Sequence, residues 1–214
     1  MSPTMLASGA AHAGVTTAGL VDIGRVAKVS GPVVVATALP RTRLFDVVRV
    51  GDDRLLGEVI KIDGEHVVMQ VFEDTTGLRV GEPVEATGEP LLAELGPGLL
   101  GGILDGTQRP LEVLGAAGSL YVARGADPPR LDRARLWDFH AAVEIGDVVG
   151  PGDLLGSVLE GQAIEHRVLA PSDLAGTVTA VRPGPATVVD PVIDVDGHPV
   201  TMLQRWPLRR ARPV

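Results

Sequence analysis

Glycine and proline recur every few residues along this chain and leave little room for a long helix. The 214 residues include 27 Gly and 17 Pro, set between short runs rich in Val, Leu, Ile and Ala. Because Gly and Pro disfavour helix interiors and favour turns, this spacing predicts many short β-strands. Aromatic residues make up only 3% of the chain, so aliphatic side chains must fill the cores. The sequence predicts a mainly all-β fold.

The first block, residues 22–90, has the pattern of a small closed barrel. Turns at Gly31-Pro32 and Asp63-Gly64 separate runs of alternating apolar residues. Asp-Gly suits the two central positions of a type I′ hairpin turn, where both residues need positive φ. Six short strands in so few residues favour closure, because a barrel leaves no exposed edge. The six expected strands are 23–29, 33–36, 46–50, 55–62, 65–72 and 80–86.

The rest of the chain divides into a bridge at 91–115, a second β-rich block at 116–203 and a basic connector at 204–214. The second block has the style of a barrel-sandwich domain, and Asp196-Gly197 predicts another type I′ hairpin. The charged run 130–138 is expected to be an exposed loop or short helix. An aliphatic-Gly-acid pattern before a strand occurs at 80–84 and again at 145–149. The expected strands of this block are 139–145, 154–159, 164–169, 175–181, 187–195 and 199–203.

The first 21 residues carry no Lys or Arg, so they lack the basic start of a signal peptide and are expected to form a flexible extension. No window has eighteen apolar residues without charges, which argues against a membrane-spanning helix.

Composition excludes several classes of function. A net charge of −8 disfavours nucleic-acid binding, and the absence of Cys excludes thiolate metal sites and cysteine nucleophiles. The two lysines are Lys28 and Lys61, so later residues supply no lysine for a Schiff base or for biotinyl or lipoyl attachment. The dipeptide Gly-Lys is absent, and a phosphate-binding P-loop requires it. We therefore expect no catalytic, cofactor-binding or metal-binding residue in this chain.

Four local patterns have a chemical interpretation and a plainer one, and the plainer one is favoured. The run 96–101 (GPGLLG) matches the dinucleotide-binding glycine pattern but lacks a strand–helix context. Asp194, Asp196 and His198 are too few for a calcium loop and fit a hairpin. The adjacent acids at 52–53 and 73–74 look like solvated turns. Trp206 beside four Arg suggests single-strand nucleic-acid binding less than a connector docked on an acidic neighbour.

Six longer runs form a specific set. They are GRVAKVSGPVVVA (24–36), FDVVRVG (45–51), GEVIKIDG (57–64), QVFEDTTGLRVGEPV (70–84), LGPGLLGGILDGTQRPLE (95–112) and TMLQRWPLRRARPV (201–214). EDTTGL followed by ELGPGLL and DGTQRPL is hard to obtain by chance. Together these runs resemble the catalytic A (alpha) subunit of V-type or archaeal-type rotary ATPases and ATP synthases, in that family's order and over nearly everything after Asp22.

The resemblance implies that residues 22–90 form a barrel in a crown with B subunits and neighbouring A subunits. Residues from about 116 to 201 would form a bulge that faces peripheral-stalk subunits or regulators. The bridge would belong to the edge of a nucleotide-binding domain, so Leu99, Leu100, Ile103 and Leu104 would lack a packing partner. The complete protein would bind ATP and Mg²⁺ on the cytoplasmic face of a membrane and couple ATP synthesis or hydrolysis to proton or sodium translocation.

This chain ends before the family's P-loop, so its phosphate-binding lysine, magnesium-binding hydroxyl and catalytic carboxylate have no counterpart here. We therefore expect an N-terminal fragment that supplies assembly surfaces and is inactive alone. The alternative is a free-standing regulatory module that competes for subunits of the ATPase.

Overall fold

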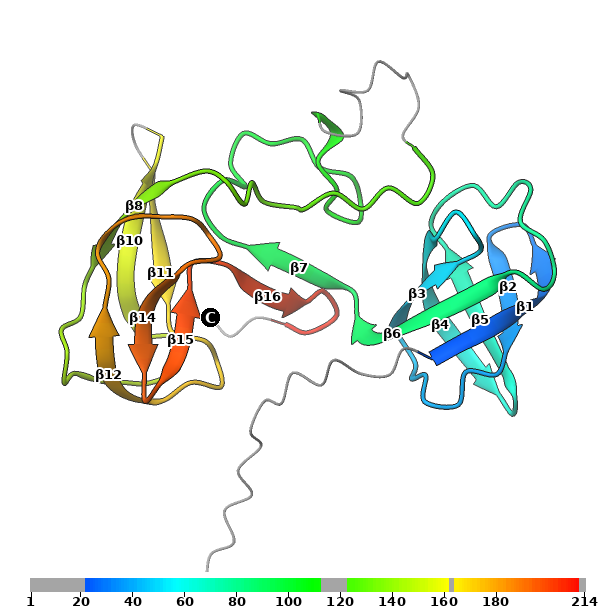
Figure 1. Ribbon diagram of the computed structural model, residues 1–214, viewed down its shortest axis with the longest axis horizontal. Helices are drawn as coiled ribbons and strands as arrows, with labels where there is room; N and C mark the ends of the chain where they lie inside the picture. Colours follow the sequence, from blue (N-terminus) through cyan, green and yellow to red (C-terminus); the bar gives the residue numbers. More distant parts are fainter. Residues whose placement is uncertain (1–21, 113–122, 162–163, 212–214) are drawn as a thin grey trace, which may run out of the picture.

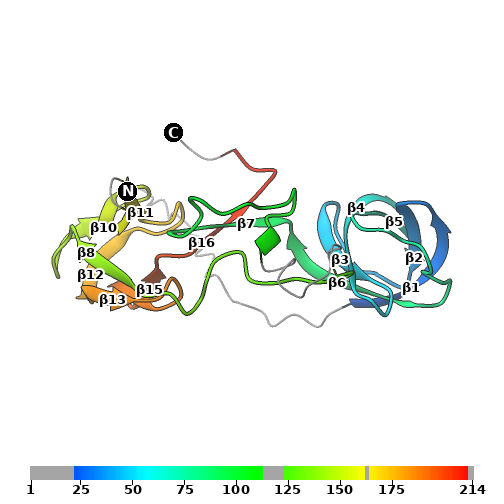
Figure 2. The same cartoon turned by 90° about the horizontal axis from the view of Figure 1, so that it is seen from above.

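Two β bodies lie at the ends of an elongated molecule, joined by a narrower middle (Figures 1 and 2). The computed structural model describes residues 22–112, 123–161 and 164–211. Sixteen strands are assigned in these ranges, which confirms the expected all-β class. The expectations for residues 1–21, and parts of those for the bridge, the second block and the basic connector, lie outside the described residues.

The first body is a closed six-stranded barrel, as the sequence predicts. Its strands follow the order β1-β2-β5-β4-β3-β6, and all neighbouring pairs are antiparallel. Its core contains no aromatic residue; Val, Ala, Leu and one Met fill it. The strands are β1 (Asp22–Ser30), β2 (Val33–Thr37), β3 (Asp46–Val50), β4 (Leu55–Asp63), β5 (His66–Val71) and β6 (Pro83–Pro90).

The two Asp-Gly sequences form different turns. In the second body Asp196 and Gly197 both have positive φ, 47° and 79°, and lie between the paired residues Val195 and His198, as expected for type I′. In the barrel Asp63 pairs with His66, so the loop residues are Gly64 and Glu65. Gly64 alone of these has positive φ (61°), the pattern of a type II′ turn. The expected type I′ turn at Asp63-Gly64 is therefore wrong. The turn is centred one residue later, and its type is II′.

The second body packs two four-stranded sheets around one core. One sheet has the order β11-β10-β8-β13 and the other β15-β14-β12-β9. Trp137 and Phe139 on β8 are buried in this core together with aliphatic residues from both sheets. The strands are β8 (Trp137–Ala141), β9 (Val148–Val149), β10 (Leu154–Glu160), β11 (Ile164–Leu169), β12 (Gly176–Val181), β13 (Gly184–Ala186), β14 (Pro191–Val195) and β15 (His198–Thr201).

Three expectations for this body are corrected. The strand expected at 187–195 begins only at Pro191, because the Asp190 carboxylate accepts hydrogen bonds from the N–H and hydroxyl of Thr187 and closes a turn at 187–190. The strand expected at 139–145 ends at Ala141 and is followed by another turn. The run 130–138 is not uniformly exposed: Leu131 (2%) and Trp137 (5%) are buried in the core, and residues 137–138 begin β8.

One four-residue turn occurs in both bodies, at 79–82, 144–147 and 150–153. In each copy the acid at position four accepts a hydrogen bond from the N–H of position one, and position three is Gly with φ of 93°, 100° or 84°. In each copy the glycine N–H and the acid carbonyl both bond to one residue: Val26 on β1, Val178 on β12, or Ala170 directly after β11. The aliphatic-Gly-acid pattern indicated the first two copies; the third has Pro151 in the aliphatic position.

A two-stranded antiparallel ribbon joins the bodies. Strand β7 (Leu92–Leu95) leaves the barrel and pairs with β16 (Gln204–Pro207), which leaves the second body (Figure 1). The bridge and the basic connector are therefore hydrogen-bonded neighbours. Leu99 packs against the second core, so its expected lack of a packing partner is wrong, whereas Leu100 (55%) and Ile103 (63%) are exposed.

Candidate functional site

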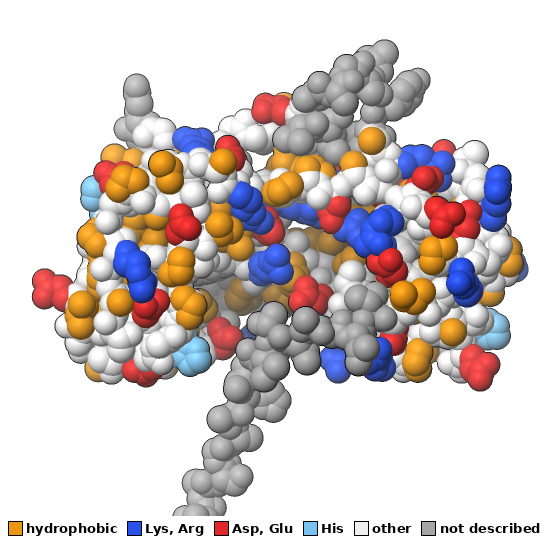
Figure 3. Space-filling model, viewed as in Figure 1, with side chains coloured by type: hydrophobic (Ala, Val, Ile, Leu, Met, Phe, Trp, Pro, Cys, Tyr) orange, Lys and Arg blue, Asp and Glu red, His pale blue; other side chains and the backbone are white. Residues whose placement is uncertain are grey.

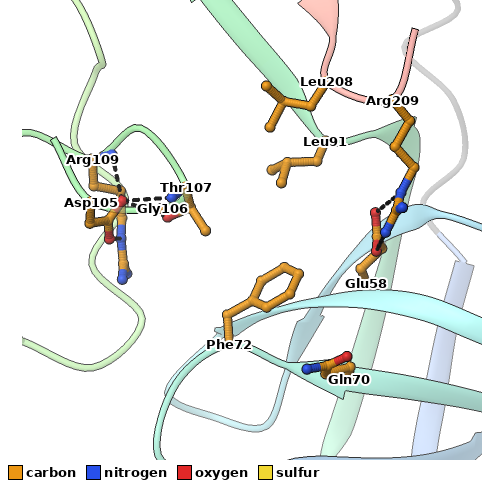
Figure 4. A pocket seen from close by; sticks show the side chains of 10 residues that line it. All are labelled: Glu58, Gln70, Phe72, Leu91, Asp105, Gly106, Thr107, Arg109, Leu208 and Arg209. Carbon is orange, nitrogen blue, oxygen red and sulfur yellow. Dashed lines mark hydrogen bonds and ion pairs between the residues drawn. The ribbon is translucent and has the colours of Figure 1, made fainter.

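The strongest concentration of buried charge lies where the barrel, the ribbon and the loop at 105–109 meet, a region we call the junction. It contains a cavity of about 520 Å³. Leu91 and Leu208 face this cavity from one side and Phe72 from the side of the barrel, and ion pairs lie at two of its edges (Figure 4). On the molecular surface, acidic and basic side chains are interspersed in the middle between the bodies (Figure 3).

Arg209 clamps the chain after β16 to the barrel wall. Its Nε donates to Oε1 of Glu58 at 3.0 Å, and its Nη2 bonds the other carboxylate oxygen, a bidentate pair. The Glu58 side chain is 6% exposed, and the hydrogen bond to it raises the pKa of Arg209. The guanidinium also lies 4.3 Å from the ring centre of Phe45. The docking of the basic connector on an acidic neighbour thus occurs within this chain.

Arg109 forms the buried centre of the junction. It is 7% exposed; its Nε bonds Asp105 at 2.7 Å and its Nη1 lies 3.5 Å from Glu73. Glu73, 8% exposed at its side chain, also accepts the N–H groups of Leu56 and Gly125. One carboxylate therefore ties a barrel loop, a barrel strand and the segment after residue 122 together.

Asp105 organises its own loop, the run DGTQR. Its Oδ1 accepts hydrogen bonds from the N–H and hydroxyl of Thr107 and from the N–H of Arg109. Burial opposes ionisation of Asp105, but the backbone and guanidinium of Arg109 and the Thr107 bonds outweigh it and lower the pKa to about 2. The loop is therefore held by a carboxylate that stays ionised at neutral pH.

Gln108, with a φ of 65°, seals the outer edge of β7. Its side-chain oxygen accepts the N–H of Glu94, and its side-chain nitrogen donates to the Glu94 carbonyl, both at 2.7 Å. The amide thus imitates a paired strand residue on the edge that β16 leaves free.

The glycine-rich run 96–101 binds an internal carboxylate. The N–H groups of Gly98 and Leu100 donate to Oε1 of Glu160 at 2.7 and 3.0 Å. Glu160 is 8% exposed and comes from β10 of the second body. The loop follows β7 and leads through turns to the 105–109 loop, so the βα context of a dinucleotide site is missing in this fully described stretch. Its free amides are used to attach the second body.

Further ion pairs cross the junction. Asp127 bonds both Arg49 of the barrel and Arg130. Glu94 on β7 bonds Arg133 at 2.5 Å and lies 3.9 Å from Arg205 on β16. These pairs connect the ribbon, the barrel and the segment at 123–133. The arrangement is suited to fixing the relative position of two bodies.

The residues that the sequence singled out are mostly dispersed. Among the described residues no group of three His, Asp or Glu is placed to hold a metal ion. His12 lies outside the described residues; His140 and His166 lie 3.5 and 3.8 Å from Asp138 and Glu160, respectively. Asp53 is exposed and lies 3.3 Å from Arg124.

Sequence reasoning missed the importance of Glu73, which was expected to be a solvated turn residue. It also assigned no role to Glu58, Gln108, Arg109 or Glu160. Apart from the pair of Arg109 with Asp105, four positions away, the hydrogen-bond partners of their side chains are 14 to 151 positions away in the chain, so local spacing could not reveal them. The signal that was present is the pair of runs EDTTGL and DGTQRPL, which supply Glu73 and the 105–109 loop.

In the part of the chain that the structure covers, no helix is long and apolar enough to cross a bilayer.

Comparison with known proteins assigns both bodies. Residues 26–88 match the family model for the ATP synthase alpha/beta family, beta-barrel domain. Residues 128–209 match the model for the ATPsynthase alpha/beta subunit barrel-sandwich domain. The second match fits the barrel-sandwich style expected from the sequence.

Relatives of known name align along most of the chain. The V-type ATP synthase alpha chain of Thermoanaerobacter sp. (strain X514) is 48% identical over 195 residues, which cover 89% of this chain and 33% of the relative. The corresponding A-type ATP synthase chain of Staphylothermus marinus is 46% identical over 191 residues, 89% of this chain and 32% of the relative. The corresponding chain of Haloferax volcanii is 49% identical over 193 residues, which cover 89% of this chain and 33% of the relative. The chain thus spans about a third of the length of these relatives.

Proposed function

Because the chain belongs to the ATP synthase alpha/beta family, we propose that it serves as the N-terminal, non-catalytic part of the alpha (A) subunit in a V/A-type rotary ATP synthase. The complete assembly would couple ATP synthesis or hydrolysis to proton or sodium translocation. The observation that carries this proposal is that two family domains occur in one chain and are joined by the β7/β16 ribbon and the junction.

The residues present do not fit a bound nucleotide. No lysine follows Lys61 and Gly-Lys is absent from all 214 residues, while the amides of the glycine-rich loop are occupied by Glu160. Phosphoryl transfer depends on such a lysine, on Mg²⁺ and on a positioned water. We therefore derive no catalytic step for these residues, and ATP and Mg²⁺ would be bound elsewhere in the assembly.

The role of these residues would be assembly. The barrel would contact B subunits and neighbouring A subunits, and the second body would face peripheral-stalk subunits or regulators. Exposed aliphatic side chains on the barrel wall support the first contact: Ile23 is 60% and Val80 68% exposed. In such an assembly the chain would lie peripherally on the cytoplasmic face of a membrane.

Co-expression tests this role. The tagged chain would be produced with the noncatalytic B subunit of a related V-type ATP synthase, and co-elution would be measured on size-exclusion chromatography. We expect a complex that is weakened by Ile23→Glu with Val80→Glu on the barrel. Elution of the unmodified chain alone at micromolar concentrations of both proteins would contradict the proposal.

Two further measurements separate the whole-subunit role from that of a free-standing regulator. An antibody against residues 22–90 should detect a band far above 22.2 kDa that comigrates with membrane-bound ATPase in extracts of the source cells. A band at the size of this chain would favour the regulator. The purified 214-residue chain should show no ATP hydrolysis above a control preparation.

A further inference from the structure

The second body exposes two aliphatic side chains at the end where β12 begins and β14 ends, at the lower left in Figure 1. Val148 is 82% and Ile145 69% exposed, the two highest fractions among the large hydrophobic side chains that the structure describes. Val148 lies on β9, a two-residue strand at the edge of its sheet. Aliphatic side chains this exposed, close together in the chain and on an edge strand, need an explanation beyond ordinary surface composition.

Hydrogen bonds show that these residues share a small surface with three acids. Val148 pairs with Thr177, so their side chains share one face. Thr177 in turn exchanges hydrogen bonds with Asp196, through N–H to Oδ1 and from the Asp196 N–H to its carbonyl. Ile145 occupies the turn 144–147, which bonds Val178 next to Thr177. We call Glu144, Ile145, Asp147, Val148, Thr177 and Asp196 the β9 patch.

The charge around this patch is strongly one-sided. Residues 136–203 contain ten Asp or Glu, two Arg and no Lys, so they carry the whole net charge of the chain, −8. The barrel residues 22–90 have twelve acids against eight bases. Between Arg135 and Arg167 there is no basic residue other than His, and Arg182 is already bonded to Asp194 at 2.6 Å. His198 is exposed beside the 196–197 turn.

We propose that the β9 patch is the docking surface for a basic, amphipathic segment of another subunit. An aliphatic centre surrounded by carboxylates is complementary to a segment with apolar anchors and flanking Lys or Arg. Nucleic acid and anionic membrane surfaces are disfavoured by the same charge. The proposal rests on the proposed assembly role and names the partner chemistry for the second body.

A second copy of this chain is the less suitable occupant. Its basic segment, residues 204–210, has Trp206 and Leu208 as apolar anchors. However, Arg209 is bonded to Glu58, Arg205 lies beside Glu94, and Arg210 lies 5.3 Å from the ring of Trp206, all within one chain. This segment would have to leave the junction to bind another copy.

The test uses the whole 214-residue chain and two synthetic peptides. One peptide is a helix-forming sequence with leucines along one face and lysines elsewhere; the other has the same composition in scrambled order. Both are titrated into ¹⁵N-labelled protein at low and moderate salt. We expect the amphipathic peptide to shift the amide signals of 144–148, 176–177 and 196–197, to bind about tenfold tighter than the scrambled one and to weaken several-fold as salt rises.

Substitutions separate apolar docking from simple charge attraction. Val148→Asp adds a negative charge, so charge attraction alone would tighten binding, whereas loss of an apolar contact weakens it by about tenfold. Asp196→Asn retains a residue that tolerates positive φ and should weaken binding severalfold. The matched control is Leu159→Asp, on β10 of the other sheet: Leu159 is 64% exposed, and its substitution should leave binding unchanged.

Three results would overturn the proposal. They are equal binding of the two peptides, tighter binding by Val148→Asp, and equal weakening by Leu159→Asp. Sedimentation showing that the chain dimerises and that Val148→Asp makes it monomeric would assign the patch to a second copy instead. Co-elution with the B subunit tests the assembly role through the barrel, so a failure here leaves that result intact.

Discussion

The barrel and the second body use similar strands in different ways. In the barrel all six strands belong to one closed cylinder, and its core is aliphatic. In the second body consecutive strands pass between two sheets, and Trp137 and Phe139 occupy the core between them. Three of the six strand pairs in the barrel join consecutive strands, against two of six in the second body, whose two sheets also pack against each other across the core. The two bodies should therefore respond differently to the same kind of substitution.

Loss of the Phe139 ring should have the largest effect on stability. Phe139 is fully buried, and its ring lies against Gly156, where an added Cβ would come within 2.4 Å of it. Phe139→Ala should lower the free energy of unfolding of the second body by about 3–5 kcal/mol, while amide exchange in the barrel stays unchanged. Met69→Ala in the barrel core is the converse experiment: it should destabilise the barrel and leave amide exchange in the second body unchanged. If either substitution lowers protection in both bodies equally, they form one cooperative unit.

Substitutions in the junction should have the next largest effect on the free energy of unfolding. Arg109→Met leaves the buried carboxylate of Glu73 and the half-buried carboxylate of Asp105 without their cation, which should cost about 3 kcal/mol. Exchange of the Gly125 amide should accelerate because Glu73 accepts its hydrogen bond. Arg124→Met removes an exposed pair with Asp53 and should cost less than about 1 kcal/mol. Equal effects of the two variants on thermal unfolding would show that burial of the junction charges is unimportant.

Acid should weaken the junction through Asp105. Its pKa is about 2 in the folded protein, below the ordinary value of 3.8. The stabilisation is therefore fully present above about pH 4 and is lost as pH falls towards 2, by about 2 kcal/mol at most. Free energies of unfolding measured from pH 2 to 6 should converge for the parent and Asp105→Asn at the acid end. Parallel curves would contradict this assignment.

Glu160→Gln should have a smaller effect. The amide oxygen can still accept both hydrogen bonds but lacks the negative charge that strengthens the bonds from the Gly98 and Leu100 N–H groups, so the cost should be about 1–2 kcal/mol. Exchange of these two amides should accelerate more than that of the core of either body. Glu165→Gln, at an exposed position bonded to Ser157, serves as the control. Unchanged exchange at Gly98 would remove Glu160 as the attachment point.

The smallest expected changes in stability come from substitutions in the two Asp-Gly sequences. Asp196 has a φ of 47°, so Asp196→Ala places a residue with a Cβ and no polar side chain in the left-handed region, at a cost of about 1 kcal/mol. Asp63 is a strand residue with an exposed Lys61 partner, so Asp63→Ala should change stability by less than about 0.5 kcal/mol. Urea unfolding of both variants measures the difference. Equal costs would indicate that both dipeptides occupy the same turn positions.

The fold was predictable where local rules determine pairing. Short runs between turn residues indicated the six barrel strands, although β6 begins at Pro83 rather than Val80 because 79–82 forms a turn. The start of β14 at Pro191 was not predictable from strand character, because only the hydrogen bonds between Thr187 and Asp190 show that 187–190 is a turn between β13 and β14, which belong to different sheets. Strand character alone does not indicate which sheet a strand joins.

The junction was predictable only as a set of unusual runs. The run DGTQR was recognised, but the role of Gln108 depends on Glu94 and that of Arg109 on Glu73, both in other elements. Adjacent acids such as Glu73-Asp74 are solvated in most turns, and burial distinguishes Glu73 from its exposed neighbour. The spatial arrangement, rather than residue type, assigns these roles.

The β7/β16 ribbon has a consequence for the order of events during synthesis. β7 is made more than a hundred residues before its partner, because Leu95 pairs with Gln204. The barrel is complete at Pro90 and can fold as it emerges, while one edge of β7 must wait for the whole second body. Gln108 follows soon after β7 and can cover the opposite edge at once. The ribbon is thus the last pairing to form, and a nascent chain paused within the second body carries one open strand edge.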